Sequence, residues 1–355
     1  MVFVKKNKRL EQKAKGKRQK RGHLYKCFLS LAFSPLPFVL AFSLVGYAII
    51  KFMEMVKNKA VLFLRMIKFS HSVFALPFAF TGAMLASAGF SEKPATFLGI
   101  AGFPPAEKLF WIIVAMVGAR SGAMGLNRIV DRRVDAANPR TAGREIPSGK
   151  ITVPDAAIFT SVALSLLIFA AYQLNPLCFK LSPLAILVLV LYSYTKRFTW
   201  MSHFVLGIAI AAAPLGAWIA VRGTLDKEIL PLSLAVVFWL AGFDVLYALQ
   251  DIDFDRGYGL HSIPQRFGIK GSLALSKLFH FITWLLLAAT GVIFGLNIIY
   301  WAGMIVIAGL LIYEHSLVKA EDLSRLDMAF FNMNGYISIA IFLFTMIAIS
   351  TGNGR

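Results

Sequence analysis

Long apolar segments alternate with short polar ones along most of the chain. A hydrocarbon core of roughly 30 Å needs about 20 apolar residues in a helix that crosses it. The pattern predicts nine such helices, at about 69–90, 108–127, 155–174, 181–197, 202–221, 229–250, 273–296, 298–314 and 328–350. We therefore expect an all-α fold, built as a multi-pass transmembrane helix bundle of about nine spans.

The polar segments between these spans alternate in charge. The basic ones are Arg128 to Lys150, Lys196 with Arg197, and Arg256 to Lys277, whereas the segments at the other ends carry little charge. Basic loops face the cytoplasm in membrane proteins. We expect a cell (inner) membrane protein whose basic loops face the cytoplasm.

The first 52 residues differ from the rest. Eleven Lys or Arg lie between Lys5 and Lys26, and an apolar stretch follows at 27–50. The basic arm is typical of a contact with anionic lipid headgroups, and nucleic-acid binding is not expected. The apolar stretch fits an interfacial or re-entrant segment, a tenth span, or a start of the natural protein at Met53 or Met55. We treat 1–52 as an accessory segment and 53–355 as the transmembrane domain.

Composition makes the acidic residues informative. Of the 355 residues, 58% are hydrophobic and 15% charged, whereas a soluble domain is about half apolar and a quarter charged. Charged side chains in or beside membrane helices are costly and mark functional sites. Only 18 residues are Asp or Glu, so a local cluster of them needs an explanation.

Two such clusters stand at ends of predicted spans. The first contains Asn127, Asp131 and Asp135, each four residues apart, and the second contains Asp244, Tyr247, Asp251 and Asp255. These spacings predict one stripe on a helix in each case. Asp131 and Asp251 are 120 positions apart, as are Asp135 and Asp255, which indicates an internal repeat. Tyr247 lies on the stripe and is a candidate contact for substrate.

Two facing stripes of carboxylates repel each other unless cations bind between them. Oxygen ligands without His or Cys favour a hard ion, and Mg²⁺ binds through a few carboxylates together with substrate phosphates. Basic side chains surround the clusters, among them Arg140, Arg144, Lys196 and Arg197. Metal ions and guanidinium groups stabilise the charge of a departing diphosphate, so the pattern indicates diphosphate chemistry with Mg²⁺ as cofactor.

The same residues resemble the UbiA superfamily of membrane prenyltransferases. The runs 127–150 (NRIVDRRVDAANPRTAGREIPSGK) and 244–268 (DVLYALQDIDFDRGYGLHSIPQRFG) are similar to that family's two aspartate motifs. The segments 67–83, 192–200 and 313–323 resemble the 4-hydroxybenzoate polyprenyltransferase branch. The resemblance covers about 60–350 and implies a helix bundle around a central cavity with its mouth at the two polar loops.

The resemblance also implies residue roles. Catalytic residues would be Asp131, Asp135, Asp251, Asp255 and Arg144; substrate-binding residues would be Asn127, Tyr247, Lys196, Arg197 and Arg140; and Mg²⁺ ligands would be Asn127, Asp131, Asp135, Asp244, Asp251 and Asp255. The implied reaction is Mg²⁺-dependent transfer of a polyprenyl group from polyprenyl diphosphate to an aromatic acid.

The acceptor stays open between 4-hydroxybenzoate, used for ubiquinone, and a dihydroxynaphthoate, used for menaquinone. Arg65 and Lys68 are candidates to bind its carboxylate. A transporter is the alternative from another class, because repeats and intramembrane charges occur there as well. Transporter charges gather near the middle of the bilayer, whereas these acidic clusters lie at helix ends.

Overall fold

The computed structural model describes residues 59–67, 75–88, 96–97, 100–101 and 103–352. The chain divides into two units, Met1–Phe63 and Leu64–Arg355, and the second of them contains both aspartate clusters. The predicted accessory segment 1–52, its boundary with the transmembrane domain, and Lys68 lie outside the described residues.

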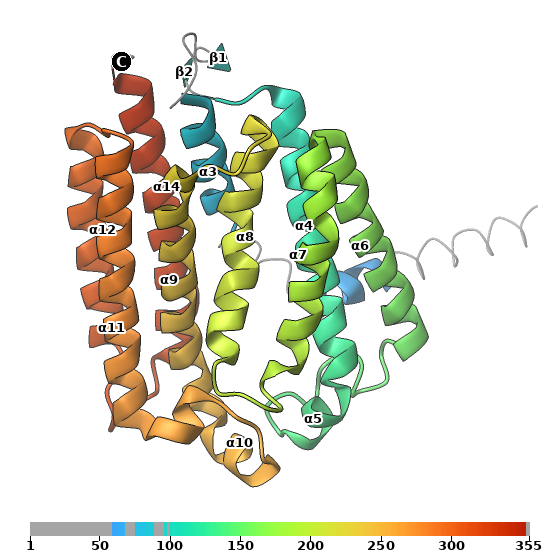
Figure 1. The fold of residues 1–355 in the computed structure, drawn as a ribbon. Coiled ribbons are helices and arrows are strands. Elements are labelled where there is room, and N and C mark those ends of the chain that lie inside the picture. Colours follow the sequence, from blue (N-terminus) through green and yellow to red (C-terminus); the bar gives the residue numbers. More distant parts are fainter. Residues whose placement is uncertain (1–58, 68–74, 89–95, 98–99, 102, 353–355) are drawn as a thin grey trace, which may run out of the picture. The chain divides into compact units, whose positions relative to one another are not determined.

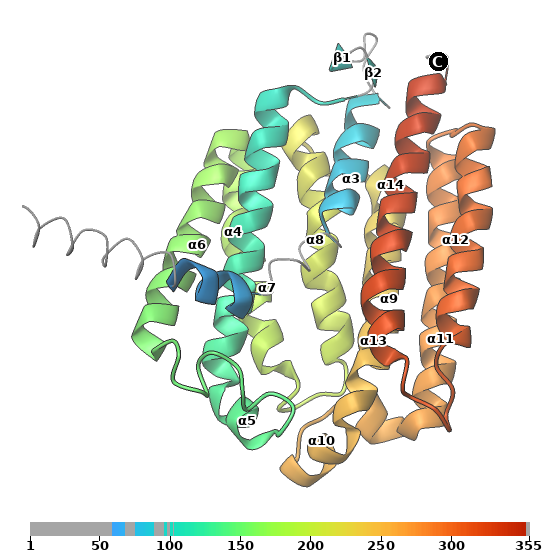
Figure 2. The same ribbon diagram turned by 180° about the vertical axis from the view of Figure 1, so that it is seen from behind.

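The second unit is a bundle of helices that run side by side (Figures 1 and 2). The described elements in chain order are α3 (Leu76–Ala88), β1 (Thr96–Phe97), β2 (Ile100–Ala101), α4 (Ala106–Val130), α5 (Arg132–Ala137), α6 (Val153–Leu174), α7 (Pro176–Thr195), α8 (Ser202–Arg222), η2 (Lys227–Ile229), α9 (Leu230–Ala248), η3 (Leu249–Asp251), α10 (Ile252–Tyr258), α11 (Ile263–Ile293), α12 (Ile298–Ser316), α13 (Leu326–Met328), η4 (Ala329–Met333) and α14 (Asn334–Thr351). β1 and β2 form one short antiparallel ladder.

Eight helical runs in the described residues are long and apolar enough to cross a membrane: α4, α6, α7, α8, the continuous run from η2 to α10, α11, α12 and α14. Each corresponds to a predicted span, and the remaining prediction, 69–90, corresponds to the shorter apolar helix α3. The all-α multi-pass fold is therefore confirmed. The central cavity stays a prediction.

Two helix starts differ from prediction because of local capping. α11 begins at Ile263, ahead of the predicted 273, since the Ser262 side chain accepts the Gln265 amide and caps the helix. Gly268, with a φ of 67°, then bends it, and Lys270 and Lys277, which suggested a loop, lie on its exposed face. α7 begins at Pro176 because the Asn175 side chain caps it through the Cys178 amide.

Close helix contacts depend on small residues. α3 packs on α8 and α14, and α4 packs on α6. A Cβ on Gly82 of α3 would stand 2.4 Å from the carbonyl oxygen of Pro214 in α8, and one on Gly118 of α4 would stand 2.8 Å from the carbonyl oxygen of Ala163 in α6. Small residues allow membrane helices to approach at backbone distance, where van der Waals contact holds them together.

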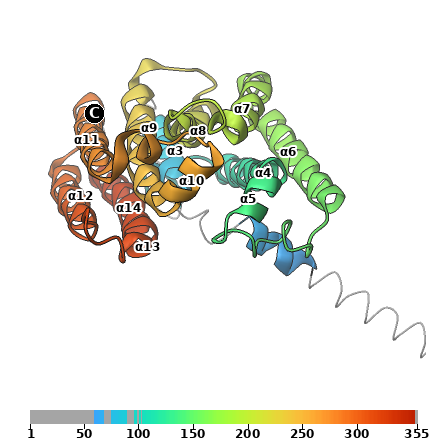
Figure 3. The same ribbon diagram turned by 90° about the horizontal axis from the view of Figure 1, so that it is seen from below.

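The two aspartate clusters lie where their helices break. α4 ends at Val130 and α9 at Ala248, and the short helices α5 and α10 follow at the same end of the bundle (Figure 3). Asp131 (φ −85°, ψ 2°) and Asp251 (φ −109°, ψ 8°) have nearly the same backbone conformation, in a sparsely populated region where active-site residues recur. The backbone conformation changes at each central aspartate, while the amides of Asp131 and Asp135 still bond to carbonyls four residues back, as the predicted spacing requires.

Replacement of Gly82 by Ala tests the α3–α8 contact. We expect Gly82→Ala to lower stability by about 1–3 kcal/mol, because the new methyl group meets backbone that cannot move away. Gly216→Ala in α8 is the matched control, since a Cβ there meets nothing within 4 Å. Thermal midpoints in detergent measure both. Equal midpoints for the two variants would contradict the contact.

Candidate active site

Asp131 is almost fully buried and is held by three side chains. Its Oδ2 accepts a hydrogen bond from Asn127 at 3.0 Å and lies 2.6 Å from the Lys196 ammonium nitrogen. Its Oδ1 accepts from Arg197 Nη2 at 2.8 Å. The break after α4 thus brings Asp131 against the end of α7, and both carboxylate oxygens are engaged there.

Asp135, in α5, is buried among arginines. Its Oδ1 lies 2.6 Å from Arg144 Nη1. Its Oδ2 lies 3.9 Å from Arg128 Nη1 and makes no hydrogen bond with the described residues. Arg128 also donates to the carbonyl of Met66. A buried carboxylate oxygen without a hydrogen bond is costly, so Oδ2 of Asp135 depends on the nearby charge of Arg128.

Asp251 joins the second cluster to the loop after the first. It accepts hydrogen bonds from the Asn138 amide at 2.9 Å and from Arg140 Nε at 2.8 Å, and the Nη2 of Arg140 makes a second, shorter contact. Arg140 also donates to the Tyr247 hydroxyl at 3.0 Å and covers its ring. Burial by itself would lower the pKa of Arg140, but the hydrogen bond and charge of Asp251 outweigh burial and raise that pKa above its usual value.

The other two acids of the second cluster have partners from the following helix and from α8. Asp255 is hydrogen-bonded to Ser262, the residue that caps α11. Asp244 Oδ2 lies 2.7 Å from Nδ1 of His203 in α8. The amide of His261 donates to the Lys196 carbonyl at 2.8 Å, which ties the loop after α10 to the end of α7.

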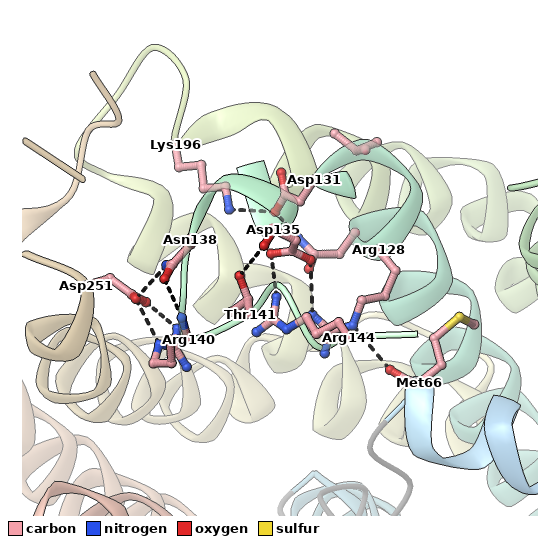
Figure 4. A network of polar contacts seen from close by, with 12 residues as sticks. Met66, Arg128, Asp131, Asp135, Asn138, Arg140, Thr141, Arg144, Lys196 and Asp251 are labelled. Atoms are coloured by element: carbon pink, nitrogen blue, oxygen red, sulfur yellow. Dashed lines mark hydrogen bonds and ion pairs between the residues drawn. The ribbon is translucent and has the colours of Figure 1, made fainter. Parts of the chain in front are cut away.

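The predicted site residues therefore form one network at one end of the bundle, and Figure 4 shows its core. In the part of the chain that the structure describes, no three His, Cys, Asp or Glu side chains lie close enough to share one ion. The predicted Mg²⁺ ligand set stays a prediction. Asp253, which lies off the predicted stripe, is exposed in α10.

Sequence reasoning missed several members of this region. Asn138 and His203 gave no signal, because each meets its aspartate only through the tertiary fold. Arg120 did give a signal in the sequence, because it is a charged residue inside the otherwise apolar span α4. It lies seven residues before Asn127 and therefore on the same face of the helix. It is half-buried, its Nε makes no hydrogen bond with the described residues, and it lies within electrostatic range of Tyr192 in α7.

Comparison with known proteins identifies the family. A model of the UbiA prenyltransferase family matches residues 75–336, which include both clusters and most of the spans. The chain belongs to the UbiA prenyltransferase family. It is thus a prenyltransferase, and the resemblance found in the sequence is confirmed.

Relatives and solved structures agree with this membership. The chain is 31% identical over 250 residues to a 4-hydroxybenzoate octaprenyltransferase of Aliivibrio salmonicida. The aligned region covers 70% of this chain and 87% of the relative. It is 30% identical over 248 residues to the enzyme of the same name from Vibrio cholerae, covering 70% and 86%. The apo structure of a UbiA homologue from Aeropyrum pernix is similar with a TM-score of 0.68 and 30% identity, over 78% of this chain and 98% of that one.

A more distant UbiA homologue shares the fold. The structure from Archaeoglobus fulgidus, solved with DMAPP and Mg²⁺ bound, has a TM-score of 0.60 at 20% identity and covers 82% of this chain and 99% of its own. The eight apolar runs and these neighbours make this UbiA family member a multi-pass membrane protein.

Arg140 should hold the two motif loops of this UbiA prenyltransferase together. We expect Arg140→Ala to lower stability by about 1–3 kcal/mol, because Asp251 then keeps one hydrogen-bond partner fewer for a partly buried charge. Thermolysin should also cleave the 131–152 loop faster. Thermal midpoint and cleavage rate are measured beside Arg256→Ala, whose side chain is on the exposed face of α10. If both variants behave alike, Arg140 does not link the loops.

Proposed function

We propose that this UbiA prenyltransferase transfers a polyprenyl group from polyprenyl diphosphate to an aromatic acid such as 4-hydroxybenzoate, a step of ubiquinone biosynthesis. One observation carries the proposal: the carboxylates of both aspartate motifs meet in one network with Lys196, Arg197, Arg140 and Arg144. Relatives named 4-hydroxybenzoate octaprenyltransferase support this acceptor.

The donor set fits Mg²⁺. It offers carboxylate and amide oxygens without thiolates, and Asp135 Oδ2 is buried without a hydrogen bond from the described residues, which suits a hard cation. A fold neighbour solved with DMAPP and Mg²⁺ supports the same choice. The residues that would hold the ion are Asn127, Asp131, Asp135, Asp244, Asp251 and Asp255. When bound, Mg²⁺ would neutralise charge on the diphosphate as its bond to carbon breaks.

Basic side chains supply the rest of the stabilisation. Lys196, Arg197, Arg140 and Arg144 now pair with Asp131, Asp251 and Asp135, and they would turn to the phosphate oxygens as diphosphate leaves with the electron pair of the C–O bond. A guanidinium group can bind two phosphate oxygens at once through two parallel hydrogen bonds. The allylic carbon becomes cationic, the ring carbon ortho to the acceptor hydroxyl bonds to it, and that ring carbon loses its proton. Tyr247, held by Arg140, would contact substrate.

The acceptor carboxylate needs a cation deeper in the bundle. Arg120 lies about 10 Å along α4 from Asn127 by helix rise, on the same face, and has an Nε free of hydrogen bonds with the described residues. Tyr192 is within electrostatic range of Arg120, Asp131 and Asp244, so Arg120 belongs to the same interior. It suits this role better than Arg65, which is exposed.

Location and domain roles follow from charge. The helices α5 and α10, which carry Asp135 and Asp255 and adjoin the basic loops, lie at one end of the bundle (Figure 1), and by the positive-inside rule we infer that this end faces the cytoplasm from the inner membrane. We assign catalysis to 53–355 and contact with anionic lipid headgroups to the basic arm in 1–52. A dihydroxynaphthoate of menaquinone biosynthesis remains the alternative acceptor, and membership of an enzyme family disfavours a transporter.

Activity in liposomes tests the function. Purified protein with Mg²⁺ and radiolabelled prenyl diphosphates of several lengths is given 4-hydroxybenzoate or 1,4-dihydroxy-6-naphthoate. We expect prenylated 4-hydroxybenzoate, loss of product with EDTA, and a fall on the order of 100-fold or more in Asp131→Asn and Asp251→Asn, since each removes a carboxylate that would hold the Mg²⁺ on the departing diphosphate.

Asp253→Asn is the matched control, because Asp253 is an exposed carboxylate close to Asp251 in sequence, and it should keep near wild-type activity. Product from the naphthoate alone would move the assignment to menaquinone. No product from either acceptor with folded protein would contradict the aromatic acceptor.

Arg120→Gln tests the acceptor site. We expect the KM for 4-hydroxybenzoate to rise about 10- to 100-fold, because a charge-assisted hydrogen bond contributes about 1.5–3 kcal/mol, while the KM for prenyl diphosphate stays the same. The variant should no longer prefer the acid over its methyl ester. Arg65→Gln is the control. A rise in the prenyl diphosphate KM instead would assign Arg120 to the diphosphate.

A further inference from the structure

His203 connects three helices at a point beside the proposed metal ligands. It is the second residue of α8 and only 3% exposed. Its Nδ1 lies 2.7 Å from Asp244 Oδ2 in α9. Its Nε2 accepts the backbone amide of Ile263, the first residue of α11, at 3.3 Å.

These two contacts fix the tautomer of the ring. A backbone N–H can only donate, so Nε2 must carry a lone pair. The proton therefore sits on Nδ1, which donates it to the Asp244 carboxylate. The first amide of a helix has no partner within the helix, so the imidazole satisfies it and directs its own donor to Asp244.

Asp244 is left with one oxygen to offer. Oδ2 is occupied by His203, and Oδ1 makes no hydrogen bond with any described residue. The side chain of Asp244 is 23% exposed, whereas that of His203 is 4% exposed. The carboxylate is thus anchored on its buried side and open on the other.

We propose that His203 is a positioning residue that holds the Asp244 carboxylate in the orientation needed to bind the Mg²⁺–diphosphate group. The inference rests on the proposed function. A ligating carboxylate that is hydrogen-bonded in advance has less freedom to lose on binding, and outer partners of this kind contribute about 10- to 100-fold to metal affinity.

The same contact couples Asp244 to the rest of the second motif. The loop before Ile263 carries Ser262, the partner of Asp255, and His261, which bonds to the Lys196 carbonyl. His203 therefore fixes the start of α11 as well as Asp244. A purely structural role would depend only on the Ile263 contact, so the two contacts must be separated by experiment.

Two substitutions separate them. In His203→Asn, the side-chain amide takes the place of the imidazole Nδ1, and its N–H can still donate to Asp244. In His203→Gln, the side-chain amide takes the place of Nε2, and its oxygen can still accept from the Ile263 backbone amide. Calorimetry measures the Kd of inorganic diphosphate with Mg²⁺, and the thermal midpoint is taken without ligand.

We expect His203→Asn to bind within about threefold of wild type but melt earlier, and His203→Gln to melt like wild type but bind about 10- to 100-fold more weakly. In an Asp244→Asn background, His203→Gln should weaken binding no further. Asp253→Asn serves as the control for a neighbouring charge.

Normal binding by His203→Gln, or weak binding by folded His203→Asn, would overturn the positioning role. If His203→Gln does not fold, the Asn variant still decides, because it must bind despite its lower midpoint. Wild-type protein that binds no Mg²⁺–diphosphate would overturn the proposed function itself, and the positioning role with it.

Discussion

Ion pairs between elements hold the aspartate-rich end of this protein together, because a carboxylate that is buried inside the protein without a partner is strongly destabilised. Asp131 and Asp135 are nearly inaccessible to solvent, and each meets basic side chains from outside α4. Removal of one partner from a buried pair costs about 3–5 kcal/mol. The pairs therefore hold the end of α7 and the 138–144 loop against the break after α4, and the positions of the remaining site residues depend on them.

This pairing also suits the proposed chemistry. A cluster of unpaired carboxylates would be strongly destabilised before any metal arrived, and a cluster of unpaired arginines would be destabilised before any diphosphate arrived. Paired with each other, both sets are stable, and a metal and a diphosphate that bind together offer each set a new partner. Exchange of partners then needs little net change in buried charge. The half-exposed Lys196, Arg197 and Arg140 are the side chains with room to exchange.

Local patterns predicted the bundle, both aspartate motifs and the basic residues around them, because apolar length, charge and spacing are visible along the chain. Features that depend on tertiary contacts were not predictable. The partners Asn138 and His203 reach their aspartates from positions distant in sequence. Arg120 was visible in the sequence as a lone charge in an apolar span. Its position on the same helix face as Asn127 is what connects it to the candidate site.

The two motifs share a backbone conformation but not their partners, and this asymmetry bears on how the site forms. Carboxylates come from both motifs, whereas the arginines come from α4, the loop after it and the end of α7. Arg128, Arg144 and Arg197 pair with the first motif, and Arg140 crosses to Asp251. The second motif is otherwise held by neutral groups, Ser262 and the His203 ring. Neither motif has a balanced set of charges alone, so the paired network forms only where the two motifs meet.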